Sequence, residues 1–132
     1  MADDTLRARL ERAAEGLVYT SEGDAPFEWV ELGTADASTP DAFRALVHGA
    51  PGARVQEVTL ERFFAGHIEG SDPTDTVAQS FRARYQALRD TLREALPDVR
   101  VFRVGEVEIR CYLVGHAPDG TLAGLATTAW ET

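Results

Sequence analysis

The chain has 132 residues, a length typical of one domain spanning 1–132, and its 44% hydrophobic content excludes disorder as a description of the whole chain. Its 22 acidic residues outnumber 13 basic residues, all of them arginine, which gives a net charge of −9. This charge repels nucleic-acid phosphates and anionic lipid, so neither direct nucleic-acid binding nor membrane binding is expected. A basic groove would attract such a surface, although acidity in many proteins serves solubility alone.

The sequence encodes neither a disulfide nor a zinc site, because Cys111 is the single cysteine. Its place among alternating apolar residues predicts a buried, unreactive thiol. The N-terminus is charged from Asp3 and shows no apolar signal region or transmembrane run. We therefore expect a cytoplasmic protein, a monomer without a cofactor.

The N-terminal part predicts a helix followed by an acidic loop. Apolar residues recur at helical spacing after Asp3 and Asp4, either of which can cap the helix. Residues 17–28 then gather Ser, Glu, Gly, Asp and Pro, a composition typical of a loop. Because apolar residues fix both of its ends, Glu22 and Asp24 are predicted to point outward. A solvated connector whose acids have no function is the alternative.

The middle of the chain predicts two short helices and a second acidic loop. A hydroxyl cap followed by proline predicts a helix that buries Phe43. A short strand and a brief helix over residues 60–64 follow. Residues 66–76 form the second acidic loop, which lacks the ligand pattern of a calcium loop. Asp72 and Pro73 are predicted to open the next helix, where an acid complements the helix dipole.

The strongest helix signal follows this loop. Apolar residues three or four positions apart predict a helix with one continuous apolar stripe, made of Val77, Phe81, Tyr85, Leu88, Leu92 and Leu96. The outer face is basic, with Arg82, Arg84, Arg89 and Arg93. We expect these arginines to pair with neighbouring acids instead of nucleic acid. Pro97 ends the helix.

The last third predicts two strands joined by a tight turn. Apolar side chains at every second position of the first strand should share its buried face: Val107, Ile109, Cys111 and Leu113. Asp119 and Gly120 suit the positive backbone angles of a hairpin turn. The second strand runs to Trp130, which can anchor that end by packing or enter the core. If this strand lies in a sheet, it holds the terminal hydroxyl and carboxylate of Thr132 near one sheet edge.

The order of elements predicts an α+β fold with a mainly antiparallel sheet and helices on both faces. Most joins between strands are too long for a meander, and the turn at Gly120 is the one clear hairpin. No metal-binding histidine pair, phosphate loop or nucleophile elbow is present, so we expect no enzyme. Glu106 and Glu108 are the carboxylates that an enzyme could use, and an ion-paired sheet face beside Arg110 explains them better.

Two separated parts of the sequence resemble the nuclease A inhibitor family, small acidic proteins that block a sugar-non-specific DNA/RNA endonuclease. The matching stretches are residues 21–22, 26–28, 101–109 and 115–124, and the ending Glu131-Thr132. The resemblance implies an α-β-α sandwich and a nuclease as the protein partner.

The resemblance also implies which residues bind the nuclease. In the family a terminal threonine reaches the catalytic Mg²⁺ of the nuclease, and a loop acid enters the same groove; Thr132 and Glu22 match these positions. We add Asp24, Asp72 and Glu131 to these two residues as further members of the predicted nuclease-binding set. Mg²⁺ takes oxygen ligands, so a hydroxyl and a carboxylate on a fixed strand end suit it. Thr132 would contact the metal only in the complex.

The sequence departs from the family at Pro73, where the family carries a bulky aromatic directly after the position of Asp72. Loss of a large apolar anchor from an interface costs about 2 kcal/mol or more. The alternative function is therefore a small-ligand or signalling module of the same fold that has lost nuclease inhibition.

Overall fold

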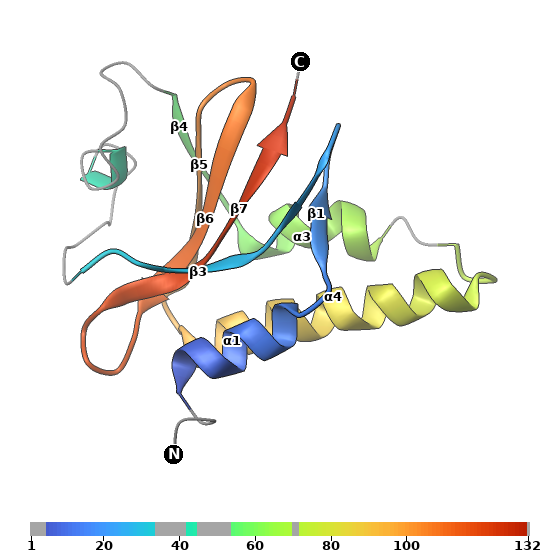
Figure 1. Cartoon of the computed structure of the whole chain (residues 1–132), viewed down its shortest axis with the longest axis horizontal. Coiled ribbons are helices and arrows are strands. Elements are labelled where there is room, and N and C mark those ends of the chain that lie inside the picture. Colours follow the sequence, from blue (N-terminus) through green and yellow to red (C-terminus); the bar gives the residue numbers. More distant parts are fainter. Residues whose placement is uncertain (1–4, 34–41, 45–53, 70–71, 132) are drawn as a thin grey trace.

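The computed structural model describes residues 5–33, 42–44, 54–69 and 72–131, and its centre is a five-stranded antiparallel sheet (Figure 1). The strands are β3 (Glu28–Glu31), β4 (Val55–Val58), β5 (Arg100–Val104), β6 (Glu108–His116) and β7 (Leu122–Trp130). They lie side by side in the order β3-β7-β6-β5-β4. The predicted α+β fold with a mainly antiparallel sheet is confirmed.

One face of the sheet is covered by the helices α1 (Leu6–Ala14), α3 (Leu60–Ile68) and α4 (Thr76–Ala95) (Figure 1). Their apolar side chains join those of the sheet in one buried cluster, which includes Leu10, Phe64, Leu88, Leu92, Cys111, Leu113 and Leu125. Burial of these side chains is the main force that fixes the layers. No helix within the described ranges is both long and apolar enough to cross a membrane.

The other face of the sheet is covered by Phe43, which belongs to the helical residues 42–44. Its ring is fully buried and stacks on Phe102 of β5, with 4.3 Å between the ring centroids. Tyr112 of β6 meets the same ring edge-on at 5.1 Å. Helical residues therefore lie on both faces of the sheet, as predicted. The rest of the helix predicted around Phe43 lies outside the described residues.

A two-stranded hairpin stands where the sequence predicted an acidic loop. Its strands β1 (Val18–Thr20) and β2 (Asp24–Pro26) pair antiparallel, so only residues 21–23 remain as the turn. The loop prediction was wrong because a three-residue strand is too short to show an alternating pattern. A tertiary contact supports the pairing: the buried hydroxyl of Thr127 in β7 donates to the carbonyl oxygen of Ala25 at 3.2 Å.

The start of α1 also differs from the prediction. Thr5 caps this helix, and its hydroxyl accepts a hydrogen bond from the backbone N–H of Ala8 at 3.1 Å. Asp3 and Asp4, the predicted caps, lie outside the described residues. Threonine and aspartate are both favoured as helix caps, so the local sequence does not distinguish Thr5 from the two aspartates before it.

The apolar stripe of α4 is buried only along its C-terminal part. Tyr85, Leu88 and Leu92 are buried, whereas Val77 is 64% exposed and Phe81 is 46% exposed. The N-terminal turns of α4 extend past the end of α1 (Figure 1). The predicted helix is therefore confirmed, but the first two positions of its apolar stripe are not covered by another element. The spacing of apolar residues defines a helix face but does not say how much of that face a neighbour covers.

A second hairpin, not predicted from the sequence, joins β5 to β6 through residues 105–107. Gly105 has φ of +117°, and a Cβ there would lie 2.5 Å from the carbonyl oxygen of Glu108, so this turn requires glycine. Val107 lies in the turn and is 57% exposed, which makes its predicted burial wrong. Burial of the other three members of that alternating set is confirmed, as is the turn at Gly120, with φ of +88°.

Candidate functional site

The tip of the β1–β2 hairpin lies against the end of β7. The backbone N–H of Glu22 donates to the carbonyl oxygen of Trp130 at 3.3 Å, and the N–H of Trp130 donates to the hydroxyl oxygen of Ser21 at 2.9 Å. Within the tip, the N–H of Ser21 donates to the carbonyl oxygen of Gly23 at 2.9 Å. These hydrogen bonds fix the tip internally and attach it to the C-terminal strand.

The indole ring of Trp130 packs on the hairpin tip. A Cβ built on Gly23 would lie 2.9 Å from Cε3 of this ring, closer than a real side chain can come. Gly23 therefore permits a close approach of backbone to ring. Trp130 is half-buried and belongs to neither buried cluster, so it acts as the anchor of the strand end and not as a core residue.

Glu131, directly after β7, is held by two contacts. Its N–H donates to the carbonyl oxygen of Val107 at 2.9 Å, and its carboxylate forms an ion pair with Arg103 of β5. The Glu131 side chain is 53% exposed, so the ion pair contributes less than about 1 kcal/mol to stability. Its main effect is to orient the chain end. Thr132, the next residue, lies outside the described residues.

Three of the predicted site residues come together at this end of the molecule. Glu22 and Asp24 are exposed on the hairpin, and Glu131 is exposed beside it at the end of β7. Figure 1 shows the tip of the hairpin next to the C-terminal end of β7. Ser21, Gly23 and Trp130, which hold these segments together, were not predicted as site residues.

Asp72 lies in a different segment, the connection between α3 and α4. Its carboxylate accepts hydrogen bonds from the N–H and the hydroxyl of Thr74, at 2.9 and 2.7 Å. These hydrogen bonds hold the pKa of the Asp72 carboxyl below its usual range, so it is ionised at neutral pH. The predicted helix start at Asp72 is wrong, because Asp75 caps α4 by accepting from the N–H groups of Val77 and Ala78.

His67, in the last turn of α3, connects this segment to the hairpin. Its Nε2 accepts a hydrogen bond from the N–H of Thr20 at 3.0 Å, and its ring packs against the rings of Tyr19 and Tyr85. Because Nε2 accepts, the proton of the neutral ring is on Nδ1, which is buried without a hydrogen-bond partner in the described part of the chain. Burial lowers the pKa of His67. Its sequence context carries no motif that could have identified this role.

A family model described as nuclease A inhibitor-like protein matches residues 4–132. The chain belongs to this family. The family predicted from the hairpin and the C-terminal third is thus confirmed, and membership supports a nuclease-inhibitor role in general. It also favours a protein partner over a catalytic function. No individually curated protein matches the chain.

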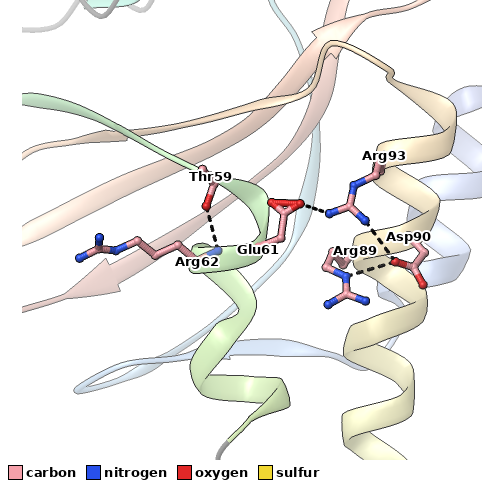
Figure 2. A network of polar contacts seen from close by, with 6 residues as sticks. All are labelled: Thr59, Glu61, Arg62, Arg89, Asp90 and Arg93. Carbon is pink, nitrogen blue, oxygen red and sulfur yellow. Dashed lines mark hydrogen bonds and ion pairs between the residues drawn. The ribbon is translucent and has the colours of Figure 1, made fainter.

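The arginines on the outer face of α4 make their contacts within the molecule. Arg93 forms ion pairs with Glu61 of α3 and with Asp90, and Arg89 contacts the same Asp90 at 3.1 Å (Figure 2). The other two donate to backbone carbonyl oxygens: Arg82 to that of Ile68 and Arg84 to that of Glu15. The expected pairing with acids is confirmed for Arg89 and Arg93. The Arg62 side chain points away from this network (Figure 2).

The carboxylates considered for an enzyme do not share a pocket in the structure as described. Glu106 is in the β5–β6 turn and lines a hollow of about 110 Å³ with Arg54 and Arg103, but Glu108 does not line it. Arg110 forms its ion pair with Glu28 of β3. The ion-paired sheet face therefore describes this region better than a catalytic pair. The described residues contain no cluster of three or more metal-ligating side chains.

Proposed function

We propose that the protein inhibits a metal-dependent non-specific nuclease by placing the hairpin tip and the end of β7 in the active-site groove of the nuclease. The observation that carries the proposal is the hydrogen bond from the N–H of Glu22 to the carbonyl oxygen of Trp130. It joins the acid of the hairpin to the strand that leads to Thr132. A site ordered before binding loses little conformational entropy in the complex.

The charge of the protein supports the same proposal. A groove that holds nucleic acid is positively charged, and the net charge of −9 attracts such a groove over a distance. Glu22 and Asp24 are exposed at the end that would enter it. Association of the protein with the nuclease should therefore be fast at low ionic strength and slower at high salt, which screens the charges.

Thr132 and Glu22 are the residues that we assign to the catalytic Mg²⁺ of the nuclease. Mg²⁺ binds oxygen ligands and keeps coordination positions open for the phosphate oxygens of the substrate. A hydroxyl and a carboxylate can take these positions without offering a bond to cleave. Glu131 is assigned to orientation of the chain end, because Arg103 already occupies its carboxylate. Asp24 and Asp72 would face the basic border of the groove.

A second candidate function is the binding of a small ligand by a protein that has lost inhibition. A hollow of about 450 Å³ favours it, whose lining includes the apolar Leu60 and Val99 and two ion pairs, Arg93 with Glu61 and Arg100 with Glu57. Its volume is within the range of small-molecule sites. It lies away from the hairpin, between the start of α3 and the end of α4.

Digestion of duplex DNA by a purified magnesium-dependent nuclease separates the two functions. With stoichiometric protein present, we expect digestion to stop and a complex to elute in gel filtration. Inhibition should set in faster at low ionic strength. Unchanged digestion, with no complex at low salt, would refute the inhibitor proposal and leave the ligand-binding function as the one to pursue.

A further inference from the structure

Two neighbouring apolar side chains are exposed on the N-terminal turns of α4. Val77 is 64% and Phe81 is 46% exposed, whereas Tyr85, the next residue along the same face, is 7% exposed. Residues four positions apart on a helix are neighbours, so Val77 and Phe81 form one continuous surface, called here the α4 patch. Neither residue belongs to a buried cluster of the described structure.

Acidic side chains border the α4 patch on the side of the helix start. Asp75 caps α4 directly before the patch, and Asp72 precedes it in the same connection. Both carboxylates are exposed, and the pKa of Asp72 is lowered by its hydrogen bonds to Thr74. The surface is therefore apolar at its centre and negative at this border.

The nearest basic residue that follows the patch on the helix, Arg82, is engaged with α3. Arg82 follows the patch, but its Nε donates to the carbonyl oxygen of Ile68 at 2.8 Å, so the side chain is turned toward α3. A partner that covers the patch should therefore present an apolar contact with lysine or arginine around it.

Exposed large hydrophobic residues occur in the described structure only beside segments that carry candidate site residues. Val107 is the third of them, and its carbonyl oxygen accepts the N–H of Glu131 at the chain end. The other two form the α4 patch, beside Asp72. Scattered exposed apolar residues need no explanation, whereas their association with two candidate binding segments points to an interface.

We propose that the α4 patch is an apolar contact of the nuclease interface, covered by an apolar part of the nuclease that basic residues surround. The inference rests on the proposed function and extends it to a helix distant from the hairpin. A symmetric contact with a second copy of this chain is disfavoured, because each copy carries a net charge of −9 and the two copies would repel each other. A nuclease surface around a nucleic-acid groove has the opposite charge.

The test is the combined substitution Val77→Ala and Phe81→Ala, which keeps good helix formers in α4. The matched control is Ala83→Ser, an exposed position on the opposite side of the same helix. Affinity for a purified magnesium-dependent nuclease is measured by surface plasmon resonance. We expect the double variant to raise Kd about 10-fold or more, mainly through faster dissociation, with an unchanged unfolding temperature. The control should stay within about twofold of the unsubstituted protein.

Hydroxyl-radical footprinting provides a measurement that needs no variant. Protection of the Phe81 ring in the complex would support the inference, and equal oxidation with and without nuclease would overturn it. If the unsubstituted protein inhibits and the double variant inhibits equally well, the α4 patch is not part of the interface while the proposed function stands. If the unsubstituted protein neither binds nor inhibits, the proposed function itself fails, and the assignment of the patch to a nuclease falls with it.

Discussion

The hydroxyl oxygen of Ser21 accepts a hydrogen bond from the backbone N–H of Trp130 at 2.9 Å, although 109 residues separate them in the sequence. The N–H of Glu22 returns a hydrogen bond to the carbonyl oxygen of the same Trp130. The hairpin tip and the C-terminal strand are thus one structural unit. A partner that contacts either of them meets both in a fixed relative position, and this makes the following predictions specific.

Removal of Thr132, or addition of a tag beyond it, is expected to weaken inhibition about 10-fold or more, because the contact with the metal is lost. A 10-fold change corresponds to about 1.4 kcal/mol of binding free energy. The unfolding temperature should remain nearly unchanged, because the buried part of β7 ends at Ala129. Inhibition assays and thermal unfolding of both forms check this. The control is the same tag at the N-terminus. If the C-terminally tagged protein inhibits as well as the untagged one, the C-terminal mechanism is wrong.

Glu22→Ala is expected to cost about 2 kcal/mol of binding free energy, about 30-fold in Kd, if its carboxylate meets a buried cation. Stability should change little, since the backbone N–H that bonds to Trp130 is retained. The measurement is the inhibition constant at two ionic strengths. Glu94→Ala, an exposed acid on α4, is the matched control for the loss of one negative charge. Equal effects of both substitutions would reduce the role of Glu22 to general charge.

Gly23→Ala is expected to weaken both stability and inhibition, because the new Cβ would lie 2.9 Å from the ring of Trp130. Displacement of that ring should cost about 1–3 kcal/mol, as overpacking does elsewhere. Gly66→Ala is the control, since a Cβ in that turn of α3 has nothing within 4 Å. In a helix this change should stabilise by about 0.5–1 kcal/mol. The free energy of unfolding of both variants is measured by urea unfolding. If Gly23→Ala leaves it unchanged, the tip can move freely against Trp130.

His67 should make stability fall as the pH drops below its usual pKa of 6.5. Burial lowers the pKa of His67 in the native state, and the nearby Asp24 only partly opposes this. Above pH 6.5 the ring is neutral in both states. Below it the unfolded chain binds a proton that the native protein does not, so stability decreases by at most about 1.4 kcal/mol per pH unit until the native pKa is reached.

His67→Gln provides the comparison for this prediction. The amide oxygen of glutamine can still accept the hydrogen bond from Thr20 but does not titrate. Urea unfolding at about pH 7.5 and pH 5.5 should show a smaller loss of stability in the variant than in the unsubstituted protein. Equal losses in the two proteins would mean that titrating groups other than His67 account for the pH dependence.

The sequence by itself determined the features that depend on local periodicity and turn chemistry. Alternating residues placed Ile109, Cys111 and Leu113 on one buried face, because side chains of a strand point to opposite sides in turn. Gly120 fixed the last hairpin, because its positive φ is readily available only to glycine. The resemblance of the hairpin and the C-terminal third also sufficed for the family, which the match over residues 4–132 confirmed.

Only the tertiary structure decided what each predicted face meets. The pairing of β1 with β2 and the attachment of their turn to Trp130 depend on hydrogen bonds between distant segments, and no local pattern encodes these. Likewise, Val77 and Phe81 carry the same helical spacing as the buried Leu88, yet they are exposed. The physical reason is that periodicity specifies the direction of a side chain, whereas burial depends on whether another element covers that direction.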